Sequence, residues 1–314
     1  MHEKISTLTK YTTVCDTPSG IGFQIEHMPE FFTYDTDNVK PHVHTFYEIL
    51  WFQEGEGTHT VDFTDYPVRK DSIFFLSPGQ VHHFDGYKDY RGVLLKFCTD
   101  FLKDEKANED IFIKYNVFNT FDSAPFCTIP DPGIAEHLAT YIRMMEEELA
   151  NSNTFGHLDM LRSLVKIFLV TVHRYGQKDG SVHLNTGKAS HRLFVQFRRV
   201  LEQEYDTLHT VKDYADRLNV SQKTLGNSVL ECSGQTPLSY INNRIILEAK
   251  RLLRFTNMMI KEVSYQLGYE DPSYFVKFFK RETGFLPSDF KEEQDLHKAD
   301  TLPCKTDFCN TERK

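Results

Sequence analysis

The chain has 314 residues, 40% of them hydrophobic and 26% charged, a composition typical of a soluble globular protein with room for two domains. The net charge of −9 argues against nucleic-acid binding through an overall positive field, and no run of about 18 apolar residues indicates a membrane span. The first residues lack the apolar core of a signal peptide and the six cysteines show no metal-ligand or disulfide spacing, so we expect reduced thiols and a cytoplasmic protein.

Between residues 22 and 98 the pattern predicts short strands without helices between them. Aromatic and β-branched residues gather in short runs, separated by turn residues. The predicted strands are 48–53, 57–63, 72–76 and 92–97, with breaks at 54–57, 65–67 and 77–79. Many short strands in succession favour an antiparallel barrel or sandwich.

A histidine-rich segment lies inside this strand region. Alternate residues of a strand share a face, so His42, His44 and Glu48 are expected to point the same way. His82 follows a Pro78-Gly79 turn near a later strand. Over residues 22–98 this arrangement resembles the paired motifs of cupins, and in cupin enzymes the four positions bind a divalent metal. Three imidazoles and a carboxylate suit such a metal, although a purely structural role for these side chains stays open.

Several other side chains of this region are assigned to the core or to the surface. We expect His59 and His83 at the surface or at the rim of a pocket. The aromatic residues are expected in the core rather than against a ligand; they are Phe46, Phe52, Phe74 and Phe84.

Residues 132–175 change to a helical pattern with two apolar stripes. The stripe of the first helix is Ile134, Leu138, Tyr141, Ile142, Met145 and Leu149. After a break at 151–153, the stripe of the second is Leu158, Leu161, Leu164, Val165, Phe168, Leu169 and Val172. Such a helical pair can pack on the barrel or on a second copy of itself. This part closes a first domain, predicted over residues 1–178.

A polar, glycine-containing stretch at 179–190 predicts a linker to a second domain. Residues 191–203 then predict a helix with an apolar face of Leu193, Phe194, Phe197, Val200 and Leu201. The second domain carries 14 basic and 12 acidic residues over 191–290, so the acidity of the chain belongs mainly to the remainder. Residues 292–314 lack periodicity and predict a disordered tail.

The segment from Ile260 to Phe290 predicts two short helices around a tight turn. Gly268 suits a left-handed turn, and Asp271 before Pro272 is a helix N-terminus. The second helix is expected to bury Tyr274, Phe275, Phe278 and Phe279 beneath a basic face. A glycine turn leading to such a helix is typical of a helix-turn-helix unit, although a plain helical hairpin would show the same pattern.

A second copy of this unit lies upstream. Val211, Tyr214 and Leu218 repeat the spacing, Asn219 takes the place of Gly268, and Ser221 caps the next helix. Residues 238–255 predict one continuous helix between the copies, with Ile241, Ile245, Ala249 and Leu252 on its apolar face. Eighteen residues span roughly 27 Å, close to one turn of DNA.

These residues resemble the DNA-binding domain of AraC/XylS-type transcription regulators over about 191–291. The resemblance is carried by Gly234-Gln235-Thr236-Pro237, Arg244–Leu253, Leu267-Gly268-Tyr269, Ser273-Tyr274-Phe275, Phe278-Phe279-Lys280 and Gly284…Pro287-Ser288. It implies an α+β chain: a cupin-like antiparallel β-barrel with a helical pair, then an all-α domain with two helix-turn-helix units joined by a helix. Gly226 departs from the pattern as a weak helix former within the first recognition helix.

The resemblance implies a DNA-binding regulator with a small-molecule effector in the barrel and no cofactor or metal. The effector residues would be His42, His44, Glu48 and His82. The DNA-contacting residues would be Gln222, Lys223, Thr224, Asn227, Ser273, Val276, Lys277 and Lys280. A homodimer through the helical pair and contact with RNA polymerase are also implied. The alternatives are a cupin metalloenzyme and a regulator with a ligand-free barrel.

Overall fold

The computed structural model describes residues 9–11, 21–28, 40–85, 89–98, 100–102, 118, 124–176 and 189–292. Its packing divides the chain into two compact units, Met1–Arg244 and Ile245–Lys314. Across the described ranges, none of the helices is both long and apolar enough to cross a membrane. The predicted tail after residue 292 and most of the predicted linker lie outside these ranges.

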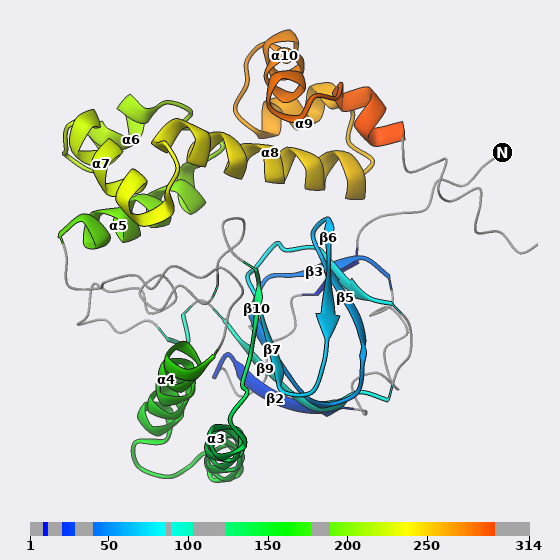
Figure 1. Ribbon diagram of the computed structural model, residues 1–314, viewed down its shortest axis with the longest axis vertical. Helices are drawn as coiled ribbons and strands as arrows, with labels where there is room; N and C mark the ends of the chain where they lie inside the picture. Colours follow the sequence, from blue (N-terminus) through cyan, green and yellow to red (C-terminus); the bar gives the residue numbers. More distant parts are fainter. Residues whose placement is uncertain are drawn as a thin grey trace, which may run out of the picture. The chain divides into compact units, whose positions relative to one another are not determined.

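Two five-stranded sheets form the β-domain in the described residues (Figure 1). In order across the first sheet, the strands are β1 (Thr9–Tyr11), β3 (His42–His44), β8 (His82–Phe84), β5 (Gly57–Val61) and β6 (Thr64–Val68). Across the second they are β10 (Phe126–Thr128), β7 (Ser72–Leu76), β4 (Tyr47–Glu54), β9 (Arg91–Phe97) and β2 (Phe23–Met28). The predicted cupin-like barrel is confirmed, except that β1 pairs with β3 in parallel.

Strand β4 is buried on both faces, which explains its unbroken apolar run. Ile49 and Trp51 pack into a core shared with the helical pair, whereas Leu50 and Phe52 face the interior between the sheets. Because side chains alternate along a strand, Glu48 shares the interior face with Leu50 and Phe52. The second sheet is thus the middle layer between the first sheet and the helices.

Strand β6 corrects the break predicted at residues 65–67. Thr64–Val68 pairs with β5, and Pro67 lies opposite Thr58. Proline lacks a donor for a central ladder, but β6 is the last strand of its sheet, where proline is tolerated. The turn falls earlier, at Asp62, whose φ of 56° is left-handed.

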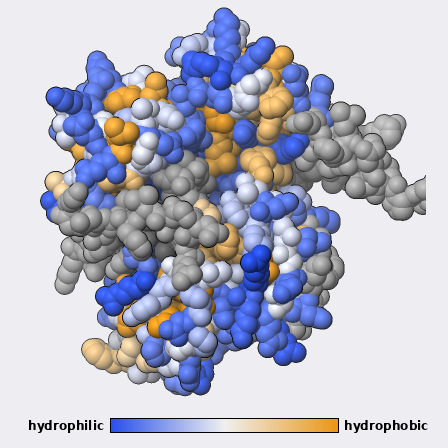
Figure 2. Space-filling view, viewed as in Figure 1, coloured by the Kyte–Doolittle hydropathy of each residue, from blue (hydrophilic) through white to orange (hydrophobic). Residues whose placement is uncertain are grey.

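Helices α3 (Pro132–Ala150) and α4 (His157–Tyr175) form a hairpin against the second sheet. The predicted stripes are confirmed, although Tyr141 and Leu149 are only partly buried. Leu158, predicted in the stripe, is 38% exposed. Hydrophobic residues also reach the surface over this hairpin in Figure 2, and the exposed ones are Met144, Phe155, Leu158, Met160, Ile167 and Tyr175.

Three of the cysteines can be compared with the expectation of reduced thiols. Cys127 and Cys232 are thiols that form no disulfide, in agreement with it. Cys98 is disulfide-bonded, so the expectation is wrong for that residue.

The first unit ends with α5 (Ala189–Glu204), α6 (Val211–Arg217), α7 (Gln222–Ser233) and the beginning of α8 (Pro237–Phe255). An aromatic core joins them, with the rings of Phe194 and Tyr240 5.5 Å apart and those of Phe197 and Tyr214 5.4 Å apart. Arg244 donates to Glu202 at 2.9 Å. Helix α5 starts two residues earlier than predicted, inside the last part of the predicted linker.

The second unit contains the remainder of α8 with α9 (Ile260–Gln266), α10 (Pro272–Thr283) and a last helical segment at 287–292. The rings of Phe279 and Phe290 lie 5.8 Å apart. Lys291 Nζ donates to the Met258 carbonyl at 2.5 Å. This last segment is thereby held against the rest of the unit.

Candidate functional site

The four predicted ligand residues of the barrel come together in one buried cluster. His42, His44, Glu48 and His82 are each only 2–3% exposed. The His42 and His82 rings lie 4.1 Å apart, and those of His44 and His82 lie 5.0 Å apart. Glu48 Oε2 lies 3.5 Å from His44 Nε2 and 4.0 Å from His82 Nε2.

The cluster is assembled from both sheets rather than from a single strand. The sequence analysis placed His42, His44 and Glu48 on one strand, but the chain bends at Thr45 and Phe46. Strand β3 therefore belongs to the first sheet and β4 to the second. The three side chains still converge, because the interior faces of the two sheets are turned toward each other.

Backbone carbonyls fix the orientation of two of the histidines. His44 Nδ1 donates to the Phe46 carbonyl at 2.6 Å, and His42 Nδ1 donates to the Lys40 carbonyl at 2.9 Å. A carbonyl only accepts, so Nδ1 carries the proton in both rings. The other ring nitrogen of His44, Nε2, faces Glu48 Oε2 at 3.5 Å.

His59 is a member of the cluster that the sequence analysis placed at the surface or rim. Its side chain is fully buried, and its Nε2 lies 3.0 Å from His82 Nδ1. His59 lies two residues before Val61 on β5, and Val61 pairs with His82 on β8. The alternation of β5 could have indicated this, because His59 shares a face with the buried Val61.

Burial and neighbouring charges set the protonation of the cluster. Burial lowers the pKa of His82 well below its usual value, with His42, His44 and His59 adding to the effect. Burial likewise lowers the pKa of His59 to about 3. Burial alone would raise the pKa of Glu48, but the neighbouring imidazole of His44, 3.5 Å away, and then the charge of Lys96 hold it below its usual value. At neutral pH the cluster therefore combines the Glu48 carboxylate with neutral imidazoles at His59 and His82.

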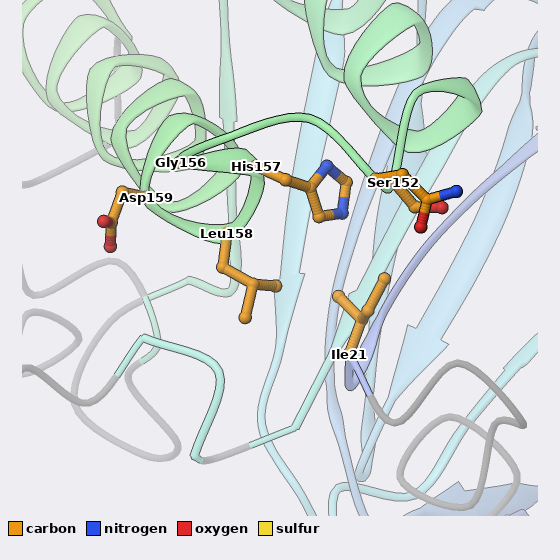
Figure 3. A pocket seen from close by; sticks show the side chains of 7 residues that line it. Ile21, Ser152, Gly156, His157, Leu158 and Asp159 are labelled. Carbon is orange, nitrogen blue, oxygen red and sulfur yellow. The ribbon is translucent and has the colours of Figure 1, made fainter.

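A separate surface hollow lies at the turn between α3 and α4 (Figure 3). It is lined by Ile21, Ser152, Asn153, Gly156, His157, Leu158 and Asp159. The His157 ring points toward the Ser152 side, and Asp159 projects in the opposite direction. His157 Nδ1 lies 3.3 Å from Glu148 Oε1. None of the predicted ligand residues lines this hollow, so it is distinct from the barrel cluster.

Helices α6 and α7 form the first predicted helix-turn-helix unit. Asn219 has a left-handed φ of 55°, and Ser221 accepts a hydrogen bond from the Thr224 amide as N-cap. Leu225 and Val229 are buried. The four side chains predicted to contact DNA are all exposed; they are Gln222, Lys223, Thr224 and Asn227.

Helices α9 and α10 repeat this geometry. Gly268 has a φ of 77°, and Asp271 accepts from the Ser273 amide at 2.8 Å. The turns match in detail, since Val220 N donates to the Ala215 carbonyl and Tyr269 N donates to the Ser264 carbonyl, each at 3.0 Å. The predicted internal repeat is therefore confirmed.

The faces of α10 differ from the prediction at one residue. Ser273, Lys277 and Lys280 are exposed and Val276 is half-buried, as a DNA-facing surface requires. Tyr274, predicted in the buried stripe, is 59% exposed. The buried stripe is Phe275, Phe278 and Phe279. The Tyr269 ring, 5.5 Å from that of Phe278, occupies the core position expected for Tyr274.

Two family models match the chain. Residues 27–164 match the AraC-like ligand binding domain, and residues 214–293 match a helix-turn-helix domain. The first match contains the barrel cluster and most of the helical pair. The second contains both turns and both recognition helices.

Relatives of low identity match over most of the chain. The chain is 23% identical over 260 residues to the HTH-type transcriptional activator RhaR of Escherichia coli strain K12, covering 82% of this chain and 89% of that protein. It is 23% identical over 246 residues to RhaR of Enterobacter sp. strain 638, covering 78% and 84%. Among solved structures, fatty-acid-bound ToxT from Vibrio cholerae strain SCE256 is 16% identical, covering 79% of this chain and 87% of that one. The TM-score of this match is 0.35.

Proposed function

Since this chain belongs to the AraC/XylS type of transcription regulators, we propose that it binds a specific DNA operator under the control of a ligand held in its barrel. One observation carries the proposal: two helix-turn-helix units of matching geometry follow a barrel with a closed polar cluster. Such a regulator acts on the chromosome, so a cytoplasmic location is part of the proposal.

The recognition helices α7 and α10 supply the proposed DNA contacts. In α7, Gln222, Lys223 and Asn227 would contact base edges, with Thr224 near phosphate. In α10 the candidates are Ser273, Val276, Lys277 and Lys280. Amide side chains pair with adenine and lysine with guanine, and valine can contact a thymine methyl group. Their exposure on the helix faces supports this assignment.

Local charge supports DNA binding where the net charge does not. Within the described residues, Lys223, Lys277 and Lys280 have no ion-pair partner, so their charge is available to phosphate or to base edges. Arg281, by contrast, is paired with Glu282. Affinity would therefore depend on a few cations on α7 and α10 rather than on a broad positive field.

The proposed control site is the barrel cluster of His42, His44, Glu48 and His82. A ligand changes DNA affinity only by binding two states of the protein with different affinity. The cluster joins the two sheets of the barrel, and its second sheet carries the α3–α4 hairpin. A ligand that draws the sheets together is thereby coupled to the hairpin, through which we also propose that the regulator dimerises.

The two RhaR relatives named above are transcriptional activators. This similarity supports the proposal that the chain regulates transcription and the proposal that RNA polymerase is a partner. An enzyme would not require the repeated helix-turn-helix units. The family match therefore favours a regulator over the cupin metalloenzyme.

Genome-wide binding of the purified full-length protein tests the proposal. We expect a small number of enriched fragments that share a motif, and loss of that enrichment in a Lys277→Ala/Lys280→Ala double variant. Repeating the experiment with His42→Ala/His44→Ala protein connects the cluster to control if the pattern changes. Folding of each variant is checked by circular dichroism. Absence of enrichment with folded wild-type protein would contradict the proposed DNA-binding function.

A further inference from the structure

We propose that His44, Glu48 and His82 form a binding site for a divalent transition-metal ion, with Zn²⁺ as the representative ion. This inference rests on the proposed function in one respect: the ion would be the ligand that controls DNA binding. The existence of the metal site itself is tested separately, by metal binding. The resemblance-based expectation was an effector site without metal. The side-chain geometry favours the ion.

Three potential ligand atoms converge without other partners. One ligand atom each from His44, Glu48 and His82 lies within 4.8 Å of the others. His44 Nε2, Glu48 Oε2 and His82 Nε2 are all buried and have no hydrogen-bond partner. Buried polar atoms are normally satisfied, and leaving one unpaired costs roughly 1–3 kcal/mol. Three such atoms pointing at one another are best explained by a shared ligand between them.

Hydrogen bonds behind the histidines orient them as metal ligands. The Phe46 carbonyl holds the Nδ1 proton of His44, which directs the Nε2 lone pair inward. His59 Nε2 lies against Nδ1 of His82 at 3.0 Å and plays the same part when it accepts that proton. Metal-binding histidines usually donate their other ring N–H in this way. The buried His59, whose ring stacks on that of Phe84, would thereby also hold His82 in the orientation of a metal ligand.

The spacing fits a small transition-metal ion after a modest contraction. With ligand bonds of about 2.1 Å, a tetrahedral zinc site places its ligand atoms roughly 3.4 Å apart. Glu48 Oε2 is already 3.5 Å from His44 Nε2 and 4.0 Å from His82 Nε2. The required shift is thus below about 1 Å for these pairs.

The donor atoms and the closed packing select the class of ligand. Two imidazoles and a carboxylate suit Zn²⁺, Fe²⁺ and related ions, whereas Ca²⁺ and Mg²⁺ prefer oxygen donors. An organic molecule would have to separate the His42 and His82 rings, whose centroids lie only 4.1 Å apart. A single ion fits between the three ligand atoms without separating these two rings.

Metal binding to the full-length protein tests the inference directly. The protein is stripped with a chelator, dialysed and titrated with Zn²⁺ by calorimetry, and metal content is measured after gel filtration. We expect about one ion per chain and a raised Tm, since an ion that binds only the folded state stabilises it. Co²⁺ should give visible absorption bands of a low-coordinate site, a signature that requires no variant.

Matched variants locate the site. Glu48→Gln keeps the shape of the side chain but removes its charge. Removing a residue that only orients a metal ligand typically weakens metal binding roughly 10–100-fold, so removing the ligand Glu48 itself should weaken Zn²⁺ binding by more than that. His82→Gln should do the same. His83→Gln, on the same strand but outside the cluster, should bind Zn²⁺ like the wild type. Folded wild-type protein that takes up no Zn²⁺ and shows no Co²⁺ bands would overturn the inference, as would unchanged binding in folded Glu48→Gln and His82→Gln proteins.

Operator binding, measured in parallel on stripped and loaded protein, separates this inference from the proposed function. Sequence-specific DNA binding without uptake of metal would refute the metal site and leave the regulator intact. Uptake that depends on Glu48 and His82, without any DNA binding, would support the metal site and refute the regulator. A difference in operator affinity between the two forms would support the ion as the controlling ligand.

Discussion

Lys277 carries the sharpest residue-scale prediction for DNA recognition. It is exposed on α10 and has no ion-pair partner within the described part of the chain. If it reads a guanine, Lys277→Ala should cost about 1–3 kcal/mol on the operator and relax specificity at one base pair. Fluorescence anisotropy with the operator and its single-base variants measures both effects.

The control for Lys277 is Lys70→Ala, which removes the same charge from an exposed position of the barrel. It should leave operator affinity unchanged. Equal weakening on all sequences would assign Lys277 to a phosphate instead of a base. Unchanged affinity for the operator would remove Lys277 from the DNA-contacting set.

His191 gives a prediction about pH. Burial, followed by the charge of Arg198, lowers its pKa below the usual value. As pH falls through about 6.5, the unfolded chain binds a proton that the folded chain does not, so stability is lost below that pH by at most about 1.4 kcal/mol per pH unit. Unfolding at pH 7.5 and 5.5 should show a larger loss for wild-type protein than for His191→Gln. An equal loss in both would show that His191 does not contribute.

Which residues could be predicted from the sequence depends on how local their interactions are. Asp271 and Ser221 cap helices through amides two or three residues away, so the local sequence is sufficient to identify them. The burial of His59 depends on β8 and on the opposite sheet, which the local sequence does not reveal. Tyr274 was misassigned because Tyr269, from the preceding turn, takes its place in the core.

At the scale of elements, Gly226 lies in the interior of the recognition helix α7. A Cβ added there would meet no atom within 4 Å. Alanine loses less backbone entropy than glycine in a helix, so Gly226→Ala should stabilise the protein by about 0.5–1 kcal/mol. Chemical denaturation measures this change. A lower stability would contradict the open environment of this glycine.

The same Gly226→Ala variant tests how closely DNA approaches α7. Asn227 beside it is a proposed base contact, whereas Gly226 itself is half-buried. We expect unchanged operator affinity, measured by anisotropy, because the added methyl group clashes with nothing in the protein. Weaker binding by a more stable protein would mean that the backbone at this glycine lies against the DNA.

Helices were easier to predict than strands in this chain. The apolar stripe of α3 is contained in its own sequence, and Asp131 with Pro132 marks its beginning. Strand β6 was missed because Pro67 is acceptable only at a sheet edge, a fact of topology. The bend between β3 and β4 was missed for the same reason, since both sides of it are extended and differ only in their sheet partners.

At the scale of the whole molecule, the distribution of charge matters more than its total. The net charge is −9, yet residues 191–290 carry 14 basic against 12 acidic side chains. The first domain is acidic, which disfavours its own nonspecific attachment to DNA. Binding strength would then come from pairing two weak DNA-binding domains on one operator, and for this reason we propose that dimerisation is part of the function.

The proposed dimerisation through the α3–α4 hairpin predicts that a charge on its exposed face weakens the dimer. Met160 and Ile167 of α4 are 48% and 45% exposed, and their spacing of seven residues places them on one face of the helix. A carboxylate buried in an apolar interface is unfavourable, so Ile167→Glu should raise the dimer dissociation constant at least about tenfold, or 1.4 kcal/mol. Sedimentation analysis of the full chain measures the dissociation constant. His137→Glu, which adds the same charge at an exposed position of α3, should leave it unchanged. A dimer that persists in Ile167→Glu would assign the interface to another surface, whereas a monomer that still binds a half-site but not the full operator would connect this face to regulation.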